Sequence, residues 1–140
     1  MKFIDLTHTF KQDMPVYPGD QKPEFTQTAF LEQNGYNEIQ IKTGMHTGTH
    51  MDAPLHMLKN GKRLSQYPPE TFFGKGCLID ARNQKSIDAP LLKGIQIKKG
   101  DIVLVLTGFD KKFGAPEYYE AYLEITESFA QKMIELGVKI

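Results

Sequence analysis

The chain has 140 residues, of which 40% are apolar, with 17 basic and 17 acidic side chains. This length is typical of one globular domain that can bury its own core, so we expect a single domain over residues 1–140. The balanced charge gives no electrostatic reason to expect a nucleic acid or an anionic membrane as a partner. No stretch approaches the ~20 apolar residues of a membrane span. The first residues form too short an apolar run for a signal peptide, which predicts a cytoplasmic protein.

The first predicted element is a short strand over residues 3–7. A turn rich in proline and glycine follows at residues 14–20 and holds Tyr17 on a stiff backbone. The Tyr17 ring either forms the wall of a pocket or packs on the core. The single cysteine, Cys77, excludes a disulfide framework within one chain and fits a small buried side chain in a strand.

Two strands are predicted next, over residues 24–31 and 37–43, with Asn34-Gly35 between them as a hairpin signal. In the second strand, Ile39 and Ile41 alternate with polar residues, which is typical of a half-buried strand. This hairpin delivers the chain directly to residues 46–56. Functional side chains are common where a rigid strand ends.

Residues 46–56 hold three of the four histidines, His46, His50 and His56, together with Asp52. Imidazole and carboxylate groups are common metal ligands. In an extended chain His46 and His50 would lie about 13 Å apart at ~3.3 Å per residue, too far for one ion. A helical turn brings residues i and i+4 within ~5–6 Å, whereas Asp52 needs an extended step to point back. A shared site therefore needs a curled segment followed by an extended one.

Two residues favour that bent path. Gly48 relaxes the curled part, and its missing side chain leaves room for a metal ion. Pro54 keeps the preceding Ala53 out of the helical region. The alternative to metal binding is that surface or core histidines cluster here by chance. A structural zinc site normally uses four protein ligands and favours cysteine, so the lone Cys77 makes an open catalytic site the more natural interpretation.

The rest of the chain reads as scaffold. Strands are predicted over residues 76–81 and 102–107, and Thr126 is expected to cap a helix that runs to about residue 136. The aromatic stretch over residues 111–124 is either a packed surface loop or a lid or subunit contact.

The pattern His46-x-Gly48-Thr49-His50-x-Asp52-Ala53-Pro54-x-His56 resembles the signature of the cyclase/kynurenine formamidase family of metal-dependent hydrolases. Residues 5–7, 14–20 and 102–108 are similar to further segments of that family. The resemblance implies an α/β (α+β) fold of the swivelling β/β/α type, with a mixed sheet and few helices. It also implies a homo-oligomer, a dimer or a tetramer, that acts on a small-molecule substrate.

The resemblance further implies one or two divalent ions, Zn or Mn, with His46, His50 and Asp52 as ligands. It assigns proton transfer to His56 and a substrate contact to Tyr17. Our hypothesis is hydrolysis of a small-molecule amide, either N-formylkynurenine in tryptophan catabolism or a cyclic amide. An ion activates the attacking water, and His56 passes the proton to the leaving nitrogen.

One departure from the family concerns length. Members of the family are longer, and their second half supplies another histidine and a glutamate to the metal site. No histidine follows His56 in this sequence. We therefore expect residues 1–140 to be an N-terminal portion that lacks the C-terminal part of the family fold. The alternative function is a catalytically incomplete metal-binding or assembly protein.

Overall fold

The computed structural model describes residues 4–140. The chain divides into two compact units, Met1–Lys59 and Asn60–Ile140. The described residues form two two-stranded sheets, β1–β2 and β3–β4, and few helices. Short 3₁₀ turns make up the remaining regular structure: Pro54–His56, Leu64–Gln66, Pro69–Phe72, Ala89–Leu92, Phe109–Lys112 and Pro116–Tyr118. None of the described helices is long and apolar enough to cross a membrane.

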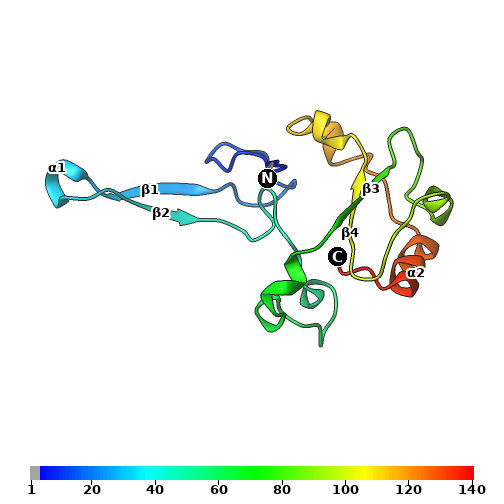
Figure 1. Cartoon of the computed structure of the whole chain (residues 1–140). Helices are drawn as coiled ribbons and strands as arrows, with labels where there is room; N and C mark the ends of the chain where they lie inside the picture. The colour runs from blue at the N-terminus through cyan, green and yellow to red at the C-terminus, as the bar shows by residue number, and fades with distance from the viewer. Residues whose placement is uncertain (1–3) are drawn as a thin grey trace. The chain divides into compact units, whose positions relative to one another are not determined.

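A β-hairpin dominates the first unit. Strand β1 (Glu24–Ala29) pairs antiparallel with β2 (Glu38–Lys42), and the one-turn helix α1 (Leu31–Asn34) lies at its tip (Figure 1). The predicted hairpin is confirmed, but its connection is longer than a two-residue turn. Asn34 accepts a hydrogen bond from the backbone amide that precedes α1, and Gly35 ends the helix at a φ of 77°.

The predicted opening strand is wrong over residues 4–7, which form no strand; residue 3 lies outside the described part of the chain. The Asp5 carboxylate accepts hydrogen bonds from the Thr7 backbone amide at 2.9 Å and from the Thr7 hydroxyl at 2.6 Å. Local bonds of this kind compete with strand pairing. They also lower the pKa of Asp5, the Thr7 hydroxyl having the larger effect.

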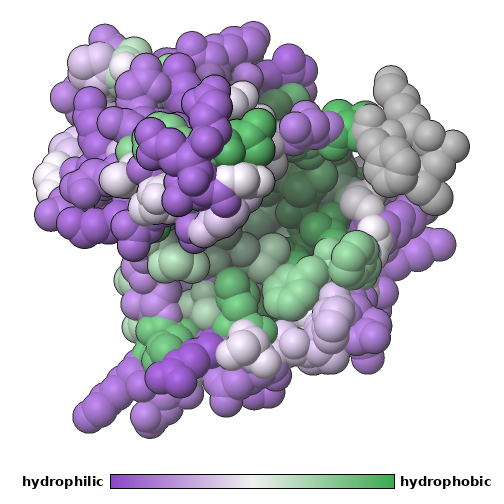
Figure 2. Space-filling model, turned by 90° about the vertical axis from the view of Figure 1, so that its left-hand side faces the viewer, coloured by the Kyte–Doolittle hydropathy of each residue, from purple (hydrophilic) through white to green (hydrophobic). Residues whose placement is uncertain are grey.

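The expected half-burial of β2 is also wrong. Ile39 and Ile41 alternate with polar residues as predicted, yet they are 59% and 50% exposed. The Phe10 ring stacks on Phe25 of β1, with centroids 5.8 Å apart, and leaves the apolar positions of β2 open. Two strands alone supply one layer, and a face is buried only where a second layer covers it. Apolar residues are visible at the surface in Figure 2.

The second unit is built on two parallel strands, β3 (Gly76–Asp80) and β4 (Ile102–Leu106). One face of this pair meets the helix α2 (Glu127–Leu136) around a buried core of Ile79, Ala81, Ile87 and Phe129. The strands alternate as a pleat requires, because Ile79 is fully buried while its neighbour Leu78 is 61% exposed. Both strands end at the same edge, since Asp80 lies beside Leu106.

The predicted helix is confirmed at both ends. Thr126 is the N-cap of α2, and Gly137 ends the helix at a φ of 66°. The Thr126 hydroxyl accepts a hydrogen bond from the Phe129 amide at 3.3 Å and donates one to the Asp88 carboxylate at 2.7 Å. Ser128 donates to the same carboxylate. This network ties α2 to the 3₁₀ turn that Asp88 caps.

Replacing Thr126 with alanine is expected to lower the free energy of unfolding by about 1–2 kcal/mol, because the cap of α2 and its bond to Asp88 are both lost. Urea denaturation measures the change. The matched variant Thr126→Ser keeps the hydroxyl and should retain most of the stability. An equal loss in both variants would show that the hydroxyl contributes nothing.

Candidate metal centre

The ligand loop follows β2 directly. The chain leaves β2 at Lys42, bends over residues 45–49, and then runs without regular structure to Ala53, which is extended at a φ of −87° and a ψ of 157°. The 3₁₀ turn Pro54–His56 begins immediately after it. The predicted path, a curled segment followed by an extended one, is confirmed, and Pro54 has the expected effect on Ala53.

This path brings three predicted ligands together. His46 Nδ1 lies 3.2 Å from His50 Nε2 and 3.0 Å from Asp52 Oδ1. His50 Nε2 lies 3.7 Å from the same carboxylate oxygen. Among residues 4–140, this is the group of three or more histidine, cysteine and acidic side chains whose ligand atoms converge, all within 4.8 Å of one another.

The three distances fit a divalent ion. Two ligands at about 2.0–2.1 Å from a tetrahedral ion lie about 3.3–3.4 Å from each other. The observed separations of 3.0, 3.2 and 3.7 Å bracket that value. Structural zinc sites favour cysteine, whereas histidine and carboxylate ligands are typical of catalytic ones. Two nitrogens and one oxygen suit either Zn or Mn.

A backbone carbonyl orients one of the ligands. His50 Nδ1 lies 2.8 Å from the carbonyl oxygen of Gly48. A carbonyl oxygen only accepts, so the proton is assigned to Nδ1, and the neutral form of this tautomer leaves the lone pair of Nε2 for an ion. That nitrogen is the one that faces His46 and Asp52. A backbone carbonyl is a usual hydrogen-bond partner of the second ring nitrogen of a histidine that binds metal.

Gly48 fixes the bend, although not as expected. Its φ is 70°, a conformation that residues with a side chain rarely adopt. A Cβ atom there would lie 2.9 Å from Cε of the buried Met14 and 3.4 Å from Cδ2 of Phe10. The space that the missing side chain leaves is therefore next to Met14 and Phe10. The expectation that it makes room for a metal ion is wrong.

Substituting Gly48 with alanine is expected to destabilise the protein by about 1–2 kcal/mol, the cost of a left-handed backbone for an L-residue, and to weaken metal binding by displacing the ligands. Denaturation and metal titration measure the two effects. Gly44→Ala is the matched control, since Gly44 has no positive φ and its nearest neighbour, Thr47 Oγ1, lies 3.8 Å away. Equal losses in both variants would contradict this role of the bend.

His56 lies beside the three converging residues rather than among them. Its ring centroid is 4.2 Å from that of His46, and the two planes are inclined by 50°. Its backbone amide donates to the Ala53 carbonyl at 2.9 Å and so belongs to the turn that Pro54 begins. His56 is therefore in ring contact with one candidate ligand but outside the converging group, and its proton-transfer role stays a prediction.

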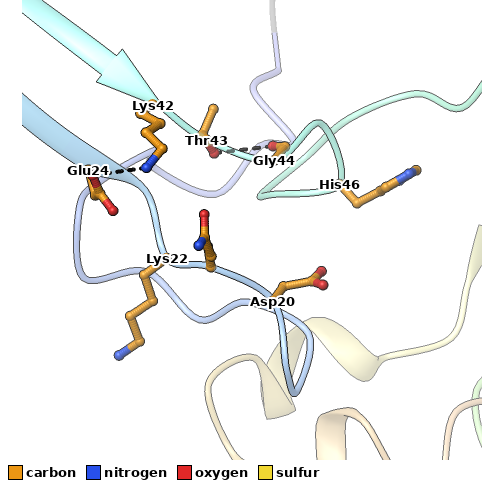
Figure 3. A pocket seen from close by; sticks show the side chains of 8 residues that line it. Asp20, Lys22, Glu24, Lys42, Thr43, Gly44 and His46 are labelled. Atoms are coloured by element: carbon orange, nitrogen blue, oxygen red, sulfur yellow. Dashed lines mark hydrogen bonds and ion pairs between the residues drawn. The ribbon is translucent and has the colours of Figure 1, made fainter.

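A cleft of about 360 Å³ adjoins His46 (Figure 3). Asp20 lines it from the proline-rich turn, Lys22 from the segment that follows this turn, and Lys42 from the end of β2. Figure 3 shows the side chains of Asp20 and His46 extending toward the same side. Lys42 pairs with Glu24 at 3.7 Å. The volume lies within the usual range of small-molecule sites.

Tyr17 is not among the residues that line this cleft, and its side chain is 57% exposed. Its predicted contact with substrate therefore stays a prediction. Sequence reasoning recognised the turn over residues 14–20 but missed Asp20, which reaches the cleft. The signal in the sequence was Pro18-Gly19, which predicts a turn directly before Asp20. In that turn the backbone amide of Asp20 donates to the Tyr17 carbonyl at 2.9 Å.

Comparison with known proteins identifies the family. The family model described as a putative cyclase matches residues 4–140. The chain belongs to this family. Among curated relatives, the kynurenine formamidase of Bacillus cereus (strain ATCC 14579) is 25% identical over 140 residues, which are 99% of this chain and 66% of the relative. That of Geobacillus thermodenitrificans is 32% identical over 107 residues, or 76% and 51% of the two chains.

Solved structures of cyclase-type proteins agree with the fold. A structure described as a potential metal-dependent hydrolase with cyclase activity has a TM-score of 0.77 and 25% identity, over 96% of this chain and 63% of that one. Isatin hydrolase A from Labrenzia aggregata has the same TM-score at 24% identity, over 96% and 64% of the two chains. This second likeness concerns only the fold. The expected family and fold class are confirmed. The chain spans 66% of the length of the Bacillus cereus relative and 63% of the first of these solved structures.

Proposed function

We propose that this chain holds one divalent ion, Zn or Mn, in a hydrolase that cleaves an amide bond of a small molecule. The observation that carries the proposal is the convergence of His46, His50 and Asp52 at distances that fit one ion. Relatives described as kynurenine formamidase and as metal-dependent hydrolase support the reaction class. Formylkynurenine and cyclic amides such as isatin are the candidate substrates.

The ion, when bound, supplies an acidified water molecule and polarises the substrate carbonyl. His46, His50 and Asp52 would hold the ion. Because only one of these three side chains is a carboxylate, a divalent ion bound there would keep a net positive charge, which would attract the carbonyl oxygen of a substrate. These side chains are solvent-accessible, His50 being the least exposed at 31%. A substrate thus reaches the centre from the solvent side without displacing a buried layer.

His56 transfers the proton in the proposed reaction. A neutral imidazole accepts the proton that the attacking water releases as its oxygen bonds to the carbonyl carbon. The same group returns the proton to the nitrogen as the C–N bond breaks. The contact between the rings of His56 and His46 supports a place for His56 next to the centre. Tyr17 is the proposed substrate contact from the neighbouring turn.

Association of copies of the chain is also part of the proposal. The exposed Ile39 and Ile41 on β2 provide an apolar face that a second layer would cover. We therefore propose a homo-oligomer, a dimer or a tetramer, acting in the cytoplasm.

The test is turnover of the full chain with N-formyl-L-kynurenine and with isatin, after removal of metal and again after addition of Zn²⁺ or Mn²⁺. We expect hydrolysis of at least one substrate, its loss on chelation and its return with metal. His50→Ala serves as the inactive control. A protein that binds metal but hydrolyses neither substrate would contradict the enzymatic proposal and favour the metal-binding or assembly protein.

A further inference from the structure

A second cavity lies in the unit Asn60–Ile140, which contains none of the candidate metal ligands. Its volume is about 550 Å³, and it is lined by the residues that follow β3 and β4, among them Arg82, Asn83 and Phe109. The two strands are parallel and end together, and the Ala81 amide bonds to the Leu106 carbonyl at 2.9 Å. Ligands of open parallel sheets bind outside the carboxyl ends of the strands.

The lining of this cavity is basic. It contains the cations Arg82, Lys111 and Lys112 and one carboxylate, Asp80, an excess of two positive charges. The chain as a whole has no net charge, so this excess is local. A concave surface lined by one sign of charge concentrates ligands of the opposite sign.

Arg82 pairs with Asp80 through part of its guanidinium group and leaves the rest unused. Nε and Nη2 donate to the two Asp80 oxygens, at 2.9 Å and 2.6 Å for the shortest contacts. These bonds lower the pKa of Asp80 to about 2, so the pair is ionised at neutral pH. Within residues 4–140, Nη1 donates no hydrogen bond. A guanidinium anchored on one edge presents the other edge to a ligand at little entropic cost.

The two loops that carry the cations are fixed by their backbones. Asn83 has a φ of 62°, the one positive value among the non-glycine residues that the structure describes. Gly108 has a φ of 78°, and a Cβ atom there would lie 3.4 Å from Cγ of Arg82. Lys112 Nζ lies 4.6 Å from the centroid of the Phe109 ring, a cation–π contact at the cavity. The left-handed conformation of Asn83 is uncommon for a residue with a side chain, and such conformations are enriched at ligand sites.

We propose that this cavity binds a small oxyanion, a carboxylate or phosphate group on a small molecule. Arg82 offers its free edge to the oxyanion, and Lys111 and Lys112 neutralise its charge. The half-buried Phe109 and Leu123 supply apolar surface for the rest of the ligand. The proposal does not depend on the metal centre.

The test is titration of the isotope-labelled full chain with inorganic phosphate and, separately, with benzoate, following amide chemical shifts by NMR. We expect saturable shifts at residues 82–84 and 107–112 with at least one probe at millimolar concentrations. Response to phosphate alone or to benzoate alone identifies the group that the site accepts. Absence of saturable shifts there with both probes overturns the proposal.

Variants localise the effect. Lys111→Gln/Lys112→Gln is expected to weaken binding about tenfold or more, since charge-assisted hydrogen bonds are lost. Arg82→Gln should do the same, and circular dichroism shows whether that variant is folded. Lys62→Gln is the matched control, because Lys62 makes a comparable contact with Tyr67, 5.5 Å from the ring centroid, away from the cavity lining. Unchanged affinity in the double variant also overturns the proposal.

Discussion

Replacing Asp52 with asparagine is expected to lower the affinity for Zn²⁺ or Mn²⁺ by more than about 100-fold. Loss of a hydrogen-bond partner of a metal ligand already costs up to about 100-fold, and loss of a direct ligand should cost more. Turnover should fall to background with it. Asp52 Oδ1 is the atom shared by the two short distances to His46 and His50, so it closes the ligand triangle. Asparagine keeps the shape of the side chain but removes its negative charge. Calorimetric titration with each metal measures the loss.

Asp13→Asn is the matched control for this change. Asp13 belongs to the same unit, is exposed, and pairs with Lys11 at 3.6 Å, so the variant removes a carboxylate without touching the ligand loop. Exposed pairs of this kind contribute little to stability. Metal affinity that is unchanged in Asp52→Asn, or reduced equally in both variants, would exclude Asp52 as a ligand.

The second large effect is expected at His56. Substitution with alanine should reduce turnover of the metal-loaded enzyme by about 10²–10⁴-fold, the usual contribution of a general acid–base group. Metal affinity should change little, because His56 contacts the ring of His46 but does not belong to the converging set. Steady-state kinetics and metal titration on the same preparations separate the two quantities.

His8→Ala is the comparison for His56→Ala, since it removes the fourth histidine of the chain. The backbone amide of His8 donates to the Thr49 hydroxyl at 3.2 Å, and alanine keeps that amide. We expect its turnover to remain close to that of the unchanged protein. Full turnover in His56→Ala would refute the proton-transfer role, whereas loss of metal in that variant would make His56 a ligand instead.

Local sequence predicted the ligand loop well because its geometry depends on neighbours in the chain. Pro54 restricts Ala53, and Gly48 permits the left-handed bend, whatever the rest of the protein does. The residue that fills the space beside Gly48 could not be predicted in this way. Met14 reaches it from more than thirty residues earlier in the sequence, and no local pattern predicts such a contact.

The same distinction between local and long-range effects applies to the fold. Helix α2 was predicted at both ends because its caps, Thr126 and Gly137, act within one turn. The alternation of Ile39 and Ile41 predicted a strand correctly, but burial depends on a covering layer that the pattern does not contain. Thr7 donates hydrogen bonds to the Asp5 carboxylate, and these residues do not form a strand. The short apolar run around them does not predict this local bonding.

The most direct test of the metal centre is titration of the isotope-labelled full chain with Mn²⁺, following line broadening of the backbone amides by NMR. Binding by His46, His50 and Asp52 predicts broadening that begins at residues 46–52 at the lowest metal concentrations and is absent from the same residues in Asp52→Asn. Broadening spread over exposed carboxylates elsewhere, or identical in the variant, would contradict the proposed metal centre.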